Sequence, residues 1–183
     1  MIKKPVNLTF TRLTEPDPEI ARTLNAWAND PGLAPLIRPH RNQAEVEKGI
    51  SITTDSLAEL LEQHPIFLIY ADGKLVGEMN YQVDPEHLFK KETGTAWIGI
   101  VIGEPAARGK GIGTRAMQYL EAQIRQQGYK RIELGVFEFN TRAYNLYIKL
   151  GFREIGRIAD FTYWQGKMWQ DIRLEKYLTK PKE

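Results

Sequence analysis

The stretch from Trp97 to Gly113, WIGIVIGEPAARGKGIG, constrains the possible folds of this chain more than any other. Its apolar run over 98–102 predicts a strand that is covered on both faces. Gly103 and Pro105 then interrupt the strand, and RGKGIG at 108–113 brings three glycines and two cations to a helix start. The first amides of a helix have no internal acceptor and lie at its positive end, so they attract anions. Because glycines let the backbone approach a ligand closely, we expect a phosphate-bearing ligand here.

Composition narrows the class of protein. A chain of 183 residues, 42% hydrophobic and 26% charged, is typical of a soluble globular protein, and we expect one domain over 1–183. The formal charge of +2 is too balanced to indicate a nucleic-acid or membrane partner. There is no cysteine, and the three histidines are scattered, so neither disulfides nor a metal site are expected. Neither a signal-peptide core nor an apolar run of about 18 residues occurs, so we expect a cytoplasmic protein.

Hydrophobic periodicity and turn residues predict the remaining elements. The expected strands lie at 8–11, 66–70, 75–83, 98–102, 132–136, 152–163 and 168–177. The first expected helix has Asp17 as its cap and Pro18 as its first residue, and a second runs over 43–52. A third opens with a capping box at 56–59, a fourth runs over 110–127, and a fifth follows Asn140 as its cap. The tail at 180–183 is expected to fray. This order predicts an α/β fold with a mixed sheet and helices on both faces.

A glycine-rich turn alone fits several kinds of site, and it also fits glycines that only permit tight packing. A P-loop requires G-x-x-x-x-G-K-[ST], but the sixth residue from Gly103 is Arg108. A dinucleotide-binding turn requires G-x-G-x-x-G/A directly after a strand, with an acidic residue about 20 positions later. Gly111 to Ala116 and Glu133 satisfy this pattern, but EPAARGK separates the strand from the glycines. A dinucleotide oxidoreductase therefore stays a distant alternative.

Two linked motifs resemble the GNAT acetyltransferase superfamily. RGKGIG at 108–113 resembles its R-x-x-G-x-G signature, and residues 140–152 match its N-x-x-A-x-x-x-Y-x-x-x-G-F element. One helix and one strand separate the motifs, as in that superfamily, and the resemblance covers about 66–178. Residues 1–65 would then supply an N-terminal strand and helices on the acceptor side. The closing strand pair resembles the branch that acetylates ribosomal-protein N-termini, which also contains small-molecule acetyltransferases.

The resemblance implies an enzyme that transfers the acetyl group of acetyl-CoA to a primary amine without a metal. The amine, from a protein N-terminus or a small molecule, would attack the thioester directly. The turn amides would take the cofactor pyrophosphate, and Lys110 and Arg115 would either flank it or be ordinary solvated residues. The strand backbone would pair with the pantetheine arm and could stabilise the oxyanion. The implied cofactor-binding residues are Val101, Ile102, Gly103, Arg108, Gly109, Lys110, Gly111, Ile112, Gly113, Thr114 and Asn140.

Tyr147 occupies the superfamily position of the tyrosine that reaches the cofactor sulfur. It also falls on the inward face of its helix, so a core aromatic is the structural alternative. Given the motif around it, we expect Tyr147 to protonate the departing thiolate as general acid. For the cofactor arm to enter, the central strand has to separate from the next one. Gly135 either provides that space or is an ordinary strand glycine.

The general base and the acceptor stay open. Glu78, Glu92 and Glu104 are candidate bases, although each also suits a surface position and deprotonation through water needs none of them. The acceptor should contact the segments 31–43, 84–94 and 161–168, which carry Arg38, His40, Arg41, Asp84, Glu86, Tyr163 and Trp164. Their mixed charge does not choose between a peptide terminus, a polyamine and an aminosugar. We expect a monomer or homodimer. A catalytically silent CoA-binding sensor or partner module is the alternative function.

Overall fold

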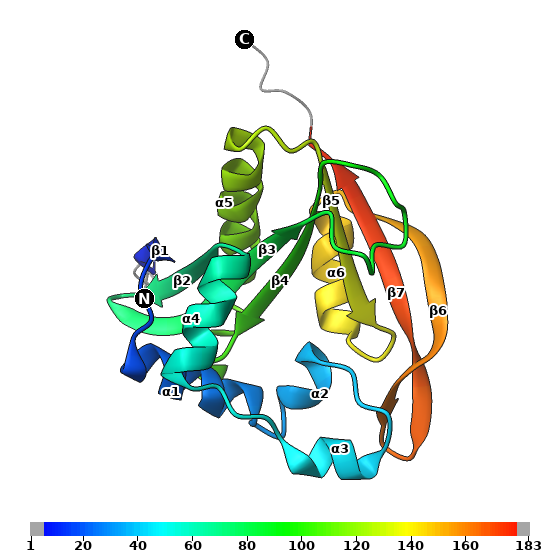
Figure 1. The fold of residues 1–183 in the computed structure, drawn as a ribbon. Helices are drawn as coiled ribbons and strands as arrows, with labels where there is room; N and C mark the ends of the chain where they lie inside the picture. Colours follow the sequence, from blue (N-terminus) through cyan, green and yellow to red (C-terminus); the bar gives the residue numbers. More distant parts are fainter. Residues whose placement is uncertain (1–5, 179–183) are drawn as a thin grey trace, which may run out of the picture.

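The computed structural model describes residues 6–178, in which seven strands form one mixed sheet (Figure 1). The strand order is β1-β2-β3-β4-β5-β7-β6. The strands are β1 (Leu8–Leu13), β2 (Ile66–Ala71), β3 (Lys74–Val83), β4 (Thr95–Ile102), β5 (Arg131–Phe137), β6 (Arg153–Trp164) and β7 (Lys167–Tyr177). Only β4 and β5 run parallel; every other neighbouring pair is antiparallel. The expected fold class is confirmed, and the expected frayed tail lies outside the described residues.

The helices begin largely where the sequence predicts. They are α1 (Pro18–Ala28), α2 (Ala34–Ile37), α3 (Gln43–Lys48), α4 (Thr54–Gln63), α5 (Ile112–Gln126) and α6 (Thr141–Lys149), with a short 3₁₀ turn at Pro105–Ala107. Asp17 caps α1 by accepting hydrogen bonds from the amides of Glu19 and Ile20. Asn140 caps α6 in the same way at the amide of Ala143. Within residues 6–178, no helix is long and apolar enough to cross a membrane.

Two predicted helices differ from the structure. The helix expected over 43–52 ends at Lys48, because Gly49 takes a left-handed conformation with φ of 66°. The side chain of Asn29 then holds both backbone groups of Ile50, which keeps the following segment out of the helix. The capping box expected at 56–59 lies three residues earlier. Thr53 Oγ1 accepts from the Ser56 amide and Ser56 Oγ accepts from the Thr53 amide, so α4 begins at Thr54.

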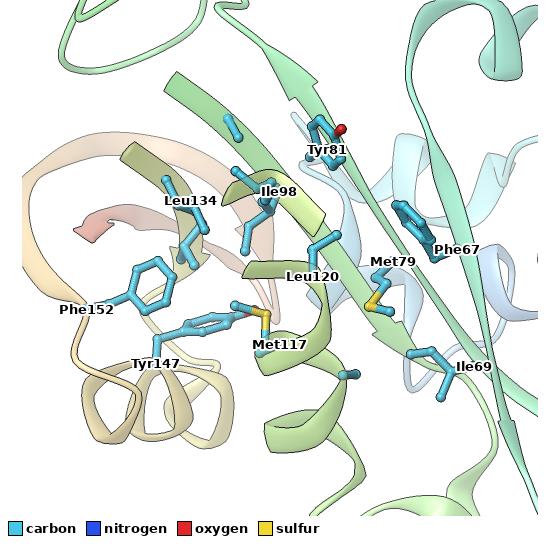
Figure 2. Close-up of a cluster of buried hydrophobic side chains, with 14 of the residues drawn as sticks. Phe67, Ile69, Met79, Tyr81, Ile98, Met117, Leu120, Leu134, Tyr147 and Phe152 are labelled. Carbon is cyan, nitrogen blue, oxygen red and sulfur yellow. The ribbon is translucent and has the colours of Figure 1, made fainter. Parts of the chain in front are cut away.

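One face of the sheet carries the main apolar core, which packs under α5 and α6 (Figure 2). The expected inward residues of α5 are Ile112, Ala116, Leu120 and Ile124, and none is more than 2% exposed. From the strands, Met79, Ile98 and Leu134 meet them. Because successive strand residues alternate between faces, their neighbours point to the other side of the sheet. This side, over α5 and α6, is called the helix face below.

The opposite side of the sheet is covered in two different ways. Over β1–β3, helices α1 and α4 close a second apolar cluster that includes Leu24, Leu57 and Ile66. Over β4, β5 and β7, the loop 84–94 covers charged side chains instead, because backbone groups of His87, Phe89 and Lys90 bond to them. The side chains that β4, β5 and β7 direct to this side, together with those of Glu78 and Asn80 on β3, are called the polar face below. From β4, β5 and β7 they are Trp97, Gly99, Val101, Arg131, Glu133, Gly135, Asp171, Arg173 and Glu175.

Candidate acetyl-transfer site

The parallel strands β4 and β5 pair only at their beginnings. The register joins Thr95 to Arg131, Ala96 to Ile132 and Trp97 to Glu133, and no pairing continues from Ile98 onward. The strands therefore separate towards their carboxyl ends, which leaves one edge of the later β4 backbone without a strand partner. This separation also corrects an expectation: residues 99–102 are only half-buried, rather than covered on both faces. An extended chain could add to β4 at this opening, called the splay below.

The glycine-rich turn presents its amides at the amino end of α5. Gly109 and Gly111 adopt φ values of 75° and 74°, which only glycine adopts without strain. The first bond to the helix backbone runs from Arg115 N to Gly111 O at 3.2 Å. Within residues 6–178, the amides from Gly109 to Thr114 have no protein acceptor. An exposed row of free amides at a helix start is suited to binding a phosphate group.

The cations around this turn have different partners. Arg108 folds back, so that Nε and Nη2 donate to the carbonyls of Ile102 and Gly103 at 3.1 and 3.0 Å. Its side chain therefore fixes the end of β4. Arg115 turns to the carbonyl of Val6 at 3.1 Å.

Lys110 remains exposed beside the turn. Sequence reasoning missed Arg142 in the first turn of α6, whose Nη2 lies 3.4 Å from where a Cβ on Gly109 would be.

Gly103 is required by packing as well as by any ligand. A Cβ at this position would lie 2.1 Å from the ring of Trp27, which is only 6% exposed. No side chain larger than hydrogen fits between the indole and the backbone. The end of α1 is thereby held against the end of β4, a contact that the sequence motifs did not identify.

Tyr147 lies on the helix face, where Figure 2 shows its ring directed from α6 towards Met117 of α5. The residue is 9% exposed, and its ring meets Phe152 edge to face at 5.8 Å between centroids. Burial raises the pKa of its phenol to about 12. Tyr147 therefore stays protonated at all physiological pH values. It is therefore a core aromatic, as the structural alternative expects, and its role as proton donor stays a prediction.

The three candidate bases lie in different places. Glu78 projects from β3 onto the polar face, directly opposite Val101 on β4. Glu92 lies in the loop before β4, where it accepts from the hydroxyl of Tyr177 at 2.6 Å, so it belongs to the opposite end of that strand. Glu104 follows β4 and pairs with Lys74 at 3.2 Å. Of the three, Glu78 alone faces the part of β4 that the splay leaves open.

The environment of Glu78 suits a base. Burial raises the pKa of its carboxyl to about 7, and a hydrogen bond from Asn80 partly offsets this. Asn80 Nδ2 lies 3.2 Å from one carboxylate oxygen and also sits against Gly99, where a Cβ would be 3.2 Å away. A carboxylate with a pKa near the working pH can both accept and release a proton readily.

The polar face contains an ionic network that sequence reasoning missed. Arg131 is 1% exposed and donates to Glu133 at 2.7 Å and to Glu175 at 2.8 Å. Arg173 is 3% exposed and donates to Asp171 at 2.6 Å, while its guanidinium lies 4.8 Å from the Trp97 ring. Glu133 is held in this network, rather than placed as the dinucleotide pattern would need. The detectable signal was the alternation of charged with apolar residues in RIELG and DIRLEK.

Gly135 faces this network at the splay. A Cβ there would lie 2.8 and 2.9 Å from the two Asp171 oxygens and 3.1 Å from Trp97 Cη2. The missing side chain thus gives room to Asp171 and Trp97, so Gly135 is more than an ordinary strand glycine. Whether it also gives room to a cofactor arm stays a prediction.

Two of the three expected acceptor segments, 31–43 and 161–168, are hydrogen-bonded to each other. The amide of His40 donates to Thr162 Oγ1 at 3.0 Å, and the amide of Tyr163 donates to the His40 carbonyl at 2.7 Å. The third segment, 84–94, lies over the beginnings of β4 and β5 instead, where Asp84 accepts from the amides of Gly94 and Thr95. Asp84 therefore shapes its own loop. In the joined region, Arg38 Nε and both ring nitrogens of His40 are buried without a partner in the described residues.

A strand splay beside a free-amide helix start, with a buried phenol on one face and a carboxylate on the other, is the arrangement that we expect for an acyl-CoA-dependent transferase. Consistently, residues 24–152 match the family model described as "Acetyltransferase (GNAT) family". The chain therefore belongs to the GNAT acetyltransferase family. It is an N-acetyltransferase that uses acetyl-CoA and an amine acceptor.

Relatives of known name support the same class. Spermine/spermidine N(1)-acetyltransferase of Bacillus subtilis is 28% identical over 119 residues, which cover 64% of this chain and 78% of the relative. A Vibrio cholerae spermidine N-acetyltransferase, solved with CoA and spermine, has a TM-score of 0.70 at 19% identity, covering 93% of this chain and 95% of that one. A ribosomal-protein-alanine N-acetyltransferase of Brucella melitensis gives 0.71 at 19% identity, covering 93% and 99%. At these identities the two structures show the fold alone.

Proposed function

We propose that acetyl transfer in this chain takes place through the splay, with cofactor and acceptor on opposite sides of the sheet. The pyrophosphate would lie at the amides of Gly109 to Thr114, and the pantetheine arm would run along β4. The acceptor amine would approach from the polar face. The observation that carries this proposal is the loss of β4–β5 pairing after Trp97, with Tyr147 on one side and Glu78 on the other.

Glu78 is proposed as the general base. An ammonium group that reaches the polar face beside Val101 would lose a proton to the Glu78 carboxylate. The neutral nitrogen would then attack the thioester carbon and form the C–N bond of a tetrahedral intermediate. Collapse of this intermediate would break the C–S bond, and the second proton of the nitrogen would leave to solvent. A backbone amide in the segment 101–103 would stabilise the tetrahedral oxyanion. Arg108 supports this step by fixing the carbonyls of Ile102 and Gly103, which holds the strand end in one orientation.

Tyr147 is proposed as the donor to the departing sulfur. A phenol with a pKa of about 12 is a weak acid, so it would donate a hydrogen bond to the thiolate first. It would pass its proton as negative charge accumulates on the sulfur. Its burial keeps water away from the thioester on the helix face, which favours attack from the acceptor side.

The acceptor is proposed to be a primary amine, with polyamines and protein N-termini as the two classes to compare. The Bacillus subtilis relative favours polyamines, and the Brucella melitensis structure has the fold of an enzyme for protein N-termini. Thiol release from acetyl-CoA, measured over a panel of spermidine, short diamines, an aminosugar and an alanine-initiated peptide, tests the proposal. Turnover with at least one amine is expected. CoA binding without turnover on any of them would favour the silent sensor.

A further inference from the structure

The carboxylate of Asp171 on the polar face has one oxygen that no described residue satisfies. The residue is 2% exposed, and Oδ1 is buried with no hydrogen-bond partner in the described residues. Oδ2 accepts from Arg173 Nε at 2.6 Å. A buried carboxylate oxygen without a hydrogen-bond donor costs free energy. We therefore expect a proton, a water molecule or a ligand to supply the missing donor.

The neighbouring cations do not supply the missing partner. Arg173 divides its charge between Asp171 and Glu133, whose oxygen lies 3.7 Å from Nη1. Glu175, further along β7, binds three other cations. Its carboxylate oxygens lie 2.8 Å from Arg131 Nε, 3.2 Å from Lys90 Nζ and 2.6 Å from Arg153 Nη2. Asp171 is thus the member of the network nearest the carboxyl end of β5 and has only a shared cation. Its burial raises the pKa of the carboxyl against the opposing effect of Arg173.

The position of this carboxylate connects it to the splay. It lies over Gly135 of β5, the strand that borders the opening, and Trp97 Cη2 lies against the same position. Asp171 itself belongs to β7, the next strand beyond β5. Glu78 lies on the same face but on β3, at the other side of the opening. Three strand spacings separate β3 from β7, which is about 14 Å between backbones before the splay adds to it. Two carboxylates therefore lie on the polar face, one on each side of the opening between β4 and β5.

We infer that Asp171 binds a second ammonium group of the acceptor, so that the site selects diamines and polyamines over monoamines. Glu78 serves the reacting amine, and Asp171 Oδ1 accepts a hydrogen bond from the distant ammonium. Gly135 is small because a larger residue would displace that carboxylate. This inference rests on the proposed function, and it names a selecting residue that the motifs do not contain.

The test compares α,ω-diamines of three to six carbons with the n-alkylamines of the same lengths, by thiol release from acetyl-CoA. In the unmodified protein, kcat/KM for the best diamine should exceed that of its monoamine at least tenfold. Asp171→Asn keeps the shape and an acceptor for Arg173, and it should reduce this ratio at least tenfold, mainly through the diamine KM. Gly135→Ala should reduce the ratio as well. Glu138→Gln, an exposed carboxylate paired with Arg157 at 3.8 Å, should leave the ratio unchanged.

Failure of this inference and failure of the proposed function give different results. Turnover of both amine classes without a preference in the unmodified protein overturns the inference, whether or not the variants fold. A loss of the same factor for both classes in Asp171→Asn also overturns it, because Asp171 would then serve the reacting amine or the fold. Absence of thiol release with every amine would instead remove the proposed function. A CoA-induced rise in melting temperature confirms that each variant is folded.

Discussion

The two faces of the sheet around the splay exclude water by different means. On the helix face, Leu120 and Ile98 pack among apolar side chains, and Tyr147 contributes a buried hydroxyl. On the polar face, equally buried positions hold Arg131, Glu133 and Glu175 in hydrogen-bonded ion pairs. A face built from dispersion contacts tolerates few charges, whereas a face built from ion pairs can exchange one partner for a charged ligand. We therefore expect the uncharged thioester to lie against the helix face and a cationic acceptor to bind at the polar face.

The strongest disruption of the polar face should come from Arg131→Met. Its removal leaves Glu133 and Glu175 buried with less compensation, which costs about 3–5 kcal/mol of unfolding free energy. Leu120→Ala on the helix face should cost about 2–5 kcal/mol through the cavity it leaves. Urea denaturation measures both. A loss below about 1 kcal/mol for Arg131→Met would show that the ion pairs are not what holds this face together.

Glu78→Gln should give the largest loss of activity. Without a base, kcat/KM at about pH 8 should fall roughly a hundredfold. Because Glu78 must be ionised to act, the rate of the unmodified enzyme should fall as the pH drops through about 7. That limb should disappear in the variant. Glu92→Gln and Glu104→Gln, the other two candidate bases, are the controls, and an acid limb that vanishes in either of them would reassign the base.

The same residue links activity to stability. The pKa of Glu78 is raised on folding to about 7, so the folded state favours its protonated form. Its ionisation therefore lowers the stability of the fold as the pH rises from its ordinary pKa to about 7. Glu78→Gln should raise the melting temperature more at pH 8 than at pH 5. An equal change at both values would mean that the carboxyl has an ordinary pKa.

Tyr147→Phe tests the helix face and should lower kcat at least tenfold with little change in CoA affinity. The phenyl ring keeps the packing against Phe152, so only the proton donor is lost. Tyr144→Phe is the matched control on the same helix, since its hydroxyl lies 3.4 Å from Glu154 at the surface. Steady-state kinetics and CoA titration distinguish the two. An unchanged kcat in Tyr147→Phe would leave Tyr147 as a packing residue only.

Arg142→Ala should give the smallest effect. An exposed cation beside the turn contributes up to about 1 kcal/mol, so the CoA dissociation constant should rise about two- to fivefold, less at high salt. Arg115→Ala is the control, because that side chain is turned to the Val6 carbonyl. Calorimetric titration measures both. A larger effect for Arg115→Ala would mean that the cations around the turn rearrange when the cofactor binds.

The sequence predicted the helix face better than the polar face, for a physical reason. Strand and helix periodicity depends on apolar residues, so the inward side of α5 and the alternation of β5 were readable. The glycine turn was also readable, because positive φ values restrict the residue type. The ion pairs of Arg131 and Arg173 depend on which strands become neighbours, and β7 joins β5 from far along the chain. Asp171 could not be recognised before that register was known.

Two contacts of the predicted site residues were not readable from the sequence for a similar reason. Arg108 was expected to contribute its backbone amide to the turn, and nothing in the sequence indicated that its guanidinium binds the carbonyls at the end of β4. Gly103 was assigned to the cofactor, and the contact with Trp27 across a long sequence separation was invisible. Periodicity and turn residues were enough to locate the helices, strands and glycine turn in the sequence. The contacts of individual side chains depend on residues far apart in the sequence, so they could not be predicted.

Hydrogen exchange with and without CoA tests the central claim most directly, because it reports on backbone amides along the splay and the turn. CoA should slow exchange in both segments, 98–103 and 109–114, while the covering loop 84–94 stays unchanged. Protection of the turn alone, or protection centred on the polar face, would contradict an arm that runs along β4 and would place the acetyl group elsewhere.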